Sequence, residues 1–257
     1  IHCMVSPNSH RIEAEPALVL HAYPFRETSL IVELFARHHG RVALVARGAR
    51  RPKSAVRGLL LAFQPMDFSW FGKGELRTLH KVEWQAVQRQ LAGTGLLCGF
   101  YLNELLMRFM QRDDAHEDLF DYYLHALLAL RDIDAATPDA MRAYAVQLRG
   151  FEVHLLRELG YGLMLDREAK NGDAIDPERS YDYFPERGPM VSNGAAIAAN
   201  VNGIKLSGKT LLDMANDDYS HLQTIAQSKQ LMRMVISHHL GGEELSTRQL
   251  MRDLQQL

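Results

Sequence analysis

Residues 40–58 read GRVALVARGARRPKSAVRG, an apolar segment that runs directly into a basic one. The short run 42–45, VALV, is apolar and half β-branched, which favours a buried strand. Gly48, Pro52 and Gly58 then break any regular pattern and predict a loop. No acidic residue interrupts the six cations, which are Arg41, Arg47, Arg50, Arg51, Lys53 and Arg57. Such a loop is a candidate site for a polyanion, although a solvated loop kept cationic for solubility has the same composition.

The distribution of charge along the chain is uneven, although the net charge of -2 is small. Residues 1–89 carry 13 Lys and Arg against 7 Asp and Glu, whereas the remainder carries 16 against 24. A basic N-terminal part and an acidic C-terminal part indicate two regions with different functions. The 257 residues are 47% hydrophobic and 23% charged, so the chain is expected to bury a core as one large domain or two ordinary ones.

Five short apolar segments with turn signals between them predict strands at 17–23, 29–35, 41–47, 63–71 and 75–84. No long helical pattern separates these segments, which favours a small closed barrel over a βαβ unit. A five-stranded barrel with a cationic loop fits the oligonucleotide-binding (OB) type, in which aromatic rings stack on bases and arginines follow the phosphates. Aromatic residues available for stacking, most of them expected in the core, are Phe25, Phe63, Phe68, Trp70 and Phe71.

The pattern changes to a helical period after residue 91. Apolar spacing predicts helices at 99–110 and 118–130 and a third from 137 to 159, where Gly160 is expected to end it. Residues 166–189 are polar and rich in turn residues, which predicts an irregular excursion. Three short helices are expected after it, at 207–215, 228–240 and 246–254, each with a serine N-cap. The predicted organisation is therefore α+β and multidomain: a disordered extension 1–16, a barrel 17–88 and a helical domain 89–257 with an irregular region 163–190.

Several function classes lack their signals in this sequence. Cys3 and Cys98 are too few for a disulfide framework and form no CxxC pair, which favours a reducing, cytoplasmic location. No run of about 18 apolar residues predicts a membrane span. The pairs His38-His39 and His238-His239 have no metal-ligand spacing, and Gly208-Lys209-Thr210 lacks the upstream glycine of a phosphate-binding loop. We therefore expect no catalytic site, no cofactor and no metal.

The residues also carry a resemblance to a known family. The run 17–65 contains the strand and loop pattern from Gly40 to Arg50, followed by Ser54, Arg57 and Gln64-Pro65. The matching segments further on are 101–106, Phe120 with 127–130, Phe151-Glu152, Leu155-Leu156, 158–162 and 228–250. In this order they resemble the bacterial recombination mediator family RecO over nearly the whole chain. Many members carry a C-x-x-C-G zinc motif after the third helix, where this chain has Glu168 and Asn171. These residues suit a closed zinc site poorly, so we expect that the loop is held together without zinc.

The resemblance implies an OB-fold barrel joined to a helical domain in a non-enzymatic, nucleoid-associated bacterial protein. It implies binding of single- and double-stranded DNA, annealing of complementary strands, and cooperation with RecR in loading RecA onto DNA coated by single-strand binding protein (SSB), with a functional link to RecF. The expected phosphate contacts are Arg41, Arg47, Arg50, Arg51, Lys53 and Arg57, supported by Lys73. The family also binds the acidic C-terminal tail of SSB, for which Arg149, beside Phe151 and Leu155, is the candidate.

Two alternative functions stay open at this point. One is an RNA-binding OB module on a helical scaffold, which a preference for a 2′-hydroxyl would reveal. The other is a protein-interaction scaffold whose basic loop docks acidic partners, which predicts no oligonucleotide binding at low salt. Arg149 equally has an ordinary alternative as a surface arginine.

Overall fold

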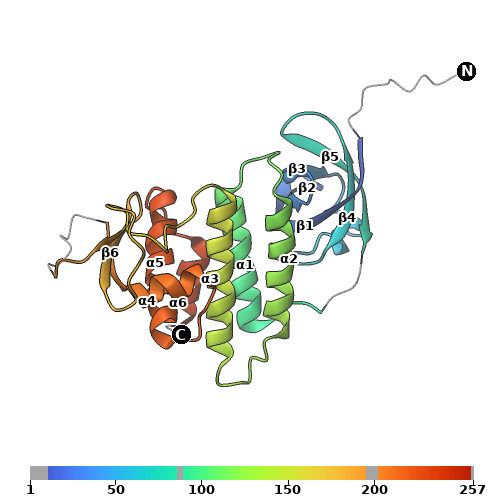
Figure 1. Ribbon diagram of the computed structural model, residues 1–257. Coiled ribbons are helices and arrows are strands. Elements are labelled where there is room, and N and C mark those ends of the chain that lie inside the picture. The colour runs from blue at the N-terminus through green and yellow to red at the C-terminus, as the bar shows by residue number, and fades with distance from the viewer. Residues whose placement is uncertain (1–10, 86–88, 195–201, 256–257) are drawn as a thin grey trace, which may run out of the picture. The chain divides into compact units, whose positions relative to one another are not determined.

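The computed structural model of the chain describes residues 11–85, 89–194 and 202–255 (Figure 1). The chain folds into two compact units, residues 1–132 and 133–257. The first unit holds the barrel together with two helices that follow it, which the sequence analysis assigned to the helical domain beginning at residue 89.

The first unit contains the predicted barrel, closed in the order β1-β2-β3-β5-β4. All neighbouring strands are antiparallel except β3 and β5, which pair in parallel. This is the OB-like architecture expected from the sequence. The strands are β1 (Arg11–Phe25), β2 (Ser29–Ala36), β3 (Gly40–Ala46), β4 (Met66–Phe71) and β5 (Leu76–Trp84).

The first strand is longer than predicted at both ends. It begins at Arg11, inside the stretch expected to be a disordered extension, and residues 1–10 lie outside the described residues. It also continues through Pro24 to Phe25, beyond the predicted end at residue 23. Pro24 is tolerated because β4 pairs only with residues 11–17 of β1, so that edge of the strand is open at the proline.

Strand β2 is buried on both faces, for two different reasons. Val32, Leu34 and Ala36 point into the barrel core, which also holds Phe68 and Trp70. The alternate residues point outward, where the helices of the first unit cover them. Phe35, for example, meets Phe120 edge to face at 5.3 Å. A strand buried on both faces reads as a continuous apolar run, which is why its sequence showed no alternation.

Helices α1 (Gly93–Phe109) and α2 (Glu117–Asp132) attach to the barrel through buried polar contacts as well as apolar ones. The amide of Asn103 donates to the backbone carbonyl of Leu20 at 2.8 Å and accepts from the hydroxyl of Tyr123. Burial raises the pKa of Tyr123, so its hydroxyl stays protonated as a donor. This chain of contacts joins α2, α1 and β1, and it satisfies a polar group that apolar packing alone would leave unpaired.

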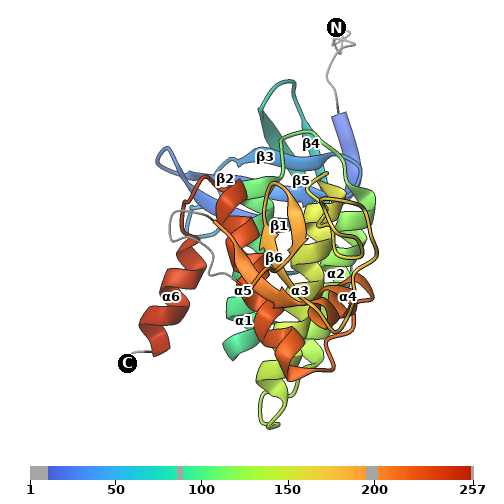
Figure 2. The ribbon, with the colours of Figure 1, turned by 60° about the vertical axis from the view of Figure 1, so that its left-hand side comes forward.

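The described residues of the second unit form four helices and a small sheet. The helices are α3 (Ala140–Glu158), α4 (Gly208–Ala215), α5 (Leu222–His239) and α6 (Ser246–Gln255). The sheet, in the order β7-β6-β8, consists of β6 (Ser180–Phe184), β7 (Gly188–Val191) and β8 (Ile204–Ser207). Figure 2 shows α4 and α5 beside this sheet. The prediction of an irregular excursion over residues 166–189 was wrong in part, because β6 and the start of β7 lie within it. These strands of four or five residues are too short to show a period.

The ends of the helices match the predictions in part. Gly160 follows α3 with φ +81, the left-handed conformation that ends a helix, as predicted. The hydroxyl of Ser207 accepts from the backbone amide of Thr210 and caps α4, also as predicted. The prediction that Ser228 caps the next helix was wrong. Helix α5 begins at Leu222, and Ser228 is buried within it, where its hydroxyl donates to the carbonyl of Ile225.

Candidate nucleic-acid interface

The segment after β3 forms a compact loop anchored from inside. We call residues 47–58 the basic loop. Two consecutive turns shape it, closed by backbone bonds from Arg51 to Gly48 and from Ser54 to Arg51, and Gly48 takes φ +69. Ala49 is fully buried against the barrel core. Figure 1 shows β3, the strand that the basic loop follows, beside β2 and β5 in the barrel. The buried alanine fixes the base of the loop and leaves its longer side chains on the outside.

Arg50 joins the basic loop to the turn between β1 and β2. Its backbone amide donates to the carbonyl of Thr28 at 2.9 Å, and its Nη1 lies 3.3 Å from the carbonyls of both Arg26 and Glu27. Arg50 therefore has a structural role, although its side chain remains exposed and keeps further N–H donors for a ligand. The contact holds two loops that are distant in sequence at one end of the barrel.

Four cations of the basic loop are exposed and uncompensated. They are Arg47, Arg51, Lys53 and Arg57. None of these side chains forms an ion pair with any residue in the described ranges. Cations without a carboxylate partner are available to phosphates, and a cluster on one loop produces a local positive potential. These four residues, together with Arg50, are the part of the predicted contact set that the fold brings together.

Arg41 occupies a different environment from the rest of the predicted set. Its Nε donates to the carboxylate of Glu33 at 3.1 Å, and its Nη1 donates to the carbonyl of Met107 at 2.6 Å. Glu33 is 1% exposed and also receives a bond of 2.5 Å from Arg112. The guanidinium of Arg41 therefore neutralises a buried carboxylate and binds the end of α1. We leave it out of the candidate interface because these contacts engage its donors.

Lys73 lies on the glycine-bearing hairpin between β4 and β5, as predicted. The parallel register pairs Ala43 of β3 with Leu76 of β5, which places this hairpin near the start of β3. The basic loop leaves the other end of the same strand. Lys73 is exposed, but the fold separates it from the basic loop by the length of β3.

The aromatic candidates divide sharply by burial. Phe63, Phe68 and Trp70 are at most 2% exposed and belong to the interior, as expected for most of the set. Phe71 is 38% exposed, and Phe25 is half-buried. The guanidinium of Arg26 lies 5.1 Å from the centre of the Phe25 ring. Sequence reasoning missed Arg26, because only the pairing of β1, β2 and β3 brings it beside a loop that is distant in sequence.

The residues predicted to bind the SSB tail lie inside the second unit. Phe151 and Leu155 are fully buried, and Arg149 is 7% exposed. Arg149 also forms an ion pair of 2.5 Å with Glu152, one turn along α3. All three side chains therefore lie in the interior of the second unit, and their role in binding the SSB tail stays a prediction. We do not extend the candidate interface to them.

The loop that replaces the family's zinc motif is closed by hydrogen bonds. The amide of Gly172 donates to the carbonyl of Glu168 at 3.0 Å, and the buried carboxylate of Glu168 accepts from the amide of Val191 at 3.3 Å. Asn171 bonds both the amide and the carboxylate of Asp173. Among the described residues, no three His, Cys, Asp or Glu side chains gather closely enough to hold a metal. Glu168 and Asn171 do not fit a zinc ion, because each already bonds within the loop and neither supplies a thiolate or imidazole.

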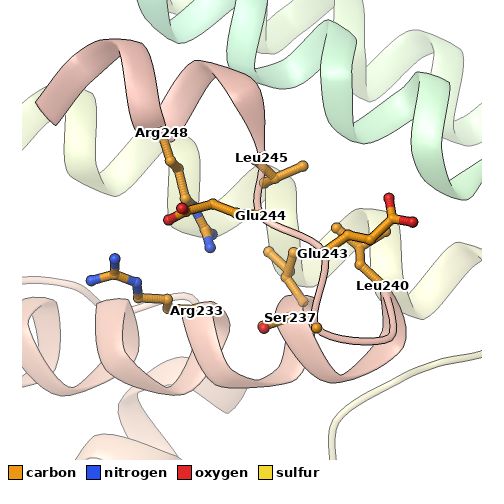
Figure 3. Close-up of a pocket in the computed structure, with 9 residues that line it drawn as sticks. Arg233, Ser237, Leu240, Glu243, Glu244, Leu245 and Arg248 are labelled. Carbon is orange, nitrogen blue, oxygen red and sulfur yellow. The ribbon is translucent and has the colours of Figure 1, made fainter. Parts of the chain in front are cut away.

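A pocket of about 220 Å³ lies in the second unit between α5 and α6 (Figure 3). Arg233 extends into it from α5 and Arg248 from α6, while Glu243, Glu244 and Leu245 come from the connecting segment. Cations and carboxylates are equal in number in this lining, so it offers no net attraction for a phosphate backbone. The basic loop is therefore a stronger candidate than this pocket for binding a polyanion.

Among the described helices, none is both long enough and apolar enough to span a membrane.

Comparison with known proteins assigns nearly the whole chain to one family. Residues 11–87 match the family described as recombination protein O N terminal, and residues 90–249 match recombination protein O C terminal. Proteins named DNA repair protein RecO are similar over nearly their whole length. The one from Nitrosospira multiformis is 52% identical, covering 97% of this chain and 99% of its own. Those from Aromatoleum aromaticum and Thiobacillus denitrificans are 49% and 51% identical, each covering 96% of this chain and 98% and 94% of their own. The chain belongs to the recombination protein O (RecO) family.

Proposed function

We propose that this protein binds DNA through the basic loop in the course of recombinational DNA repair. Membership of the family supports a role in DNA repair. The observation that carries the binding site is the group of four exposed cations, Arg47, Arg51, Lys53 and Arg57, none of which has a carboxylate partner among the described residues. Phosphate contacts do not read sequence, so the binding is sequence-tolerant.

The proposed activity is strand annealing without covalent chemistry. Two complementary strands repel each other through their phosphates, and a cationic surface that neutralises some of those charges lowers the repulsion. The same surface raises the local concentration of strands. The proposal includes the partners that the family resemblance implies: single- and double-stranded DNA, RecR, SSB and RecA. Within it, the described chain acts as a binding protein and supplies no nucleophile or metal.

The test is fluorescence anisotropy of a labelled single-stranded oligonucleotide over a series of salt concentrations. If Arg50 and the four free cations each engage a phosphate, the slope of log K against log salt is about -3.5 for a single strand. Changing Arg47, Arg51, Lys53 and Arg57 together to Ala is expected to reduce the magnitude of that slope by about 2.8 and to weaken binding at low salt.

The matched control removes the same four charges from exposed positions in the second unit: Lys170, Arg187, Lys205 and Lys229. Its slope is expected to stay that of the wild type. Equal losses in the two variants would mean that only the total charge matters, and would remove the basic loop as the site. A wild type that binds no oligonucleotide at low salt would instead support the scaffold alternative.

A further inference from the structure

We propose that His21 and Tyr23 form a platform for stacking unpaired bases, which gives this barrel a preference for single-stranded over double-stranded nucleic acid. The inference rests on the proposed DNA binding and concerns the choice between its two substrates. Neither residue was among the aromatic candidates in the sequence.

The two rings are already arranged as a stack. Alternate residues of a strand point to the same face, so His21 and Tyr23 share a face of β1. Their ring centres are 5.9 Å apart and their planes differ by 29°. Both side chains are exposed, Tyr23 by 37%. Offset stacking at this distance is favourable in itself, so each ring limits the rotation of the other. A base that stacks here meets rings already ordered and loses less freedom on binding.

The platform lies beside the cations of the proposed interface. Tyr23 is two residues before the end of β1, and the turn that follows is bonded through Arg50 to the basic loop. Arg26 on this turn adds a cation, and Glu27 is the carboxylate that the turn carries. Aromatic faces next to a phosphate-binding surface are the combination that single-strand binding proteins use. Three rings on the candidate list cannot supply it, because Phe63, Phe68 and Trp70 are buried.

The two kinds of contact respond differently to strandedness. Phosphates are exposed in both a single strand and a duplex, so the basic loop serves both. Base faces are exposed in a single strand, but inside a duplex they are covered by the neighbouring base pairs. Aromatic rings on the surface therefore add affinity for the single strand alone.

The experiment compares Tyr23→Ala, Tyr23→Phe and Phe71→Ala with the wild type. Each is titrated against a labelled single strand of about 16 nucleotides, the upper end of the site size of one OB fold, and against the duplex of equal length. Phe71 is the matched control. It is 38% exposed on the same barrel, but it pairs with Arg11 at the opposite end of β1. A third ligand, a single strand of the same length with abasic sites, tests the wild type without any substitution.

Tyr23→Ala is expected to lose about 5- to 150-fold in affinity for the single strand and less than about 2-fold for the duplex, since a stacked base contributes roughly 1–3 kcal/mol. Tyr23→Phe and Phe71→Ala should bind both ligands as the wild type does. The wild type should bind the abasic strand more weakly than the normal one, and Tyr23→Ala should bind the two equally.

The platform is overturned if Tyr23→Ala keeps the wild-type ratio of single-strand to duplex affinity, or if the loss appears in Phe71→Ala instead. A wild type that binds normal and abasic strands equally overturns it as well, even if Tyr23→Ala does not fold. In each of these cases binding persists, so DNA binding by the basic loop survives. A wild type that binds none of the ligands overturns both.

Discussion

Changing Arg41 to Ala should destabilise the first unit and leave DNA binding nearly unchanged. Arg41 is one of six cations in a single stretch of sequence, but it alone among them bonds the buried carboxylate of Glu33. Its Nη1 also donates to the carbonyl of Met107 near the end of α1. The substitution therefore tests whether the contacts in the structure, and not the sequence pattern, decide the role of a cation.

The size of the destabilisation depends on which partners Glu33 keeps after Arg41 is replaced. A hydrogen bond to a charged group contributes about 1.5–3 kcal/mol, whereas breaking a buried pair outright costs about 3–5 kcal/mol. Glu33 keeps Arg112 as a partner at 2.5 Å, so the lower range applies. We expect a loss of about 2–3 kcal/mol. For a chain of this size, that corresponds to a fall in the unfolding midpoint of roughly 4–12 °C.

The assay pairs thermal unfolding, followed by circular dichroism, with anisotropy at low salt and a temperature at which both proteins are folded. Arg57→Ala is the control, because it removes one equally basic residue that is exposed and unpaired among the described residues. Arg41→Ala should unfold earlier and keep the wild-type salt slope, while Arg57→Ala should do the reverse. An Arg41→Ala protein with the wild-type midpoint and a weakened salt slope would refute the structural role assigned to this residue.

Two further substitutions test the packing of the first unit. Gly40→Ala should destabilise the protein more than Gly74→Ala: both glycines have positive φ, but an added Cβ at Gly40 would lie 1.9 Å from the carbonyl oxygen of Asp114, whereas at Gly74 it meets nothing within 4 Å. Equal unfolding midpoints for the two variants would contradict that close approach. Asp121→Asn should lower the midpoint at pH 7 and lower it by less at pH 3, because the hydrogen bond from Arg37 lowers the pKa of Asp121. A carboxylate with a lowered pKa stabilises the fold above its unfolded pKa of about 3.9 and loses this effect as the pH falls through the folded pKa. A difference from the wild type that persists undiminished at pH 3 would show that the ion pair is not its cause.

The barrel could be predicted because its signals are local. Each strand has its own apolar run and its own turn residues, and the glycine-bearing hairpin at 72–75 closes where the sequence placed it. The helices follow equally local spacing. The sheet of the second unit escaped prediction because β6, β7 and β8 are four or five residues long. Segments this short have no measurable period. The pairing of β6 with β7 is local, but β8 pairs with β6 across the stretch of chain that contains β7.

The candidate interface was only partly predictable, since the sequence lists cations but not their partners. Arg47 and Arg41 look alike in sequence, at two ends of one apolar run. The first leaves the strand into solvent, and the second faces a carboxylate contributed by β2. Glu33 gives no warning in the sequence, because an acidic residue in a strand is usually exposed. Its burial becomes apparent only once the helices cover the outer face of β2.

The distinction between cations that are free and cations that are bonded within the fold changes the salt dependence expected for DNA binding. Counting every cation that the sequence offered, the six of the strand and loop and Lys73, predicts a salt slope of about -4.9 on a single strand at roughly 0.7 per phosphate contact. The structure assigns Arg41 to Glu33 and places Lys73 at the opposite end of β3, which leaves five contacts and a slope of about -3.5. Arg41 is removed because it bonds Glu33 and the end of α1, and Lys73 is removed because it lies away from the basic loop. Counting the cations in this sequence therefore overstates the salt dependence of DNA binding, because the fold neutralises one of them and separates another from the loop.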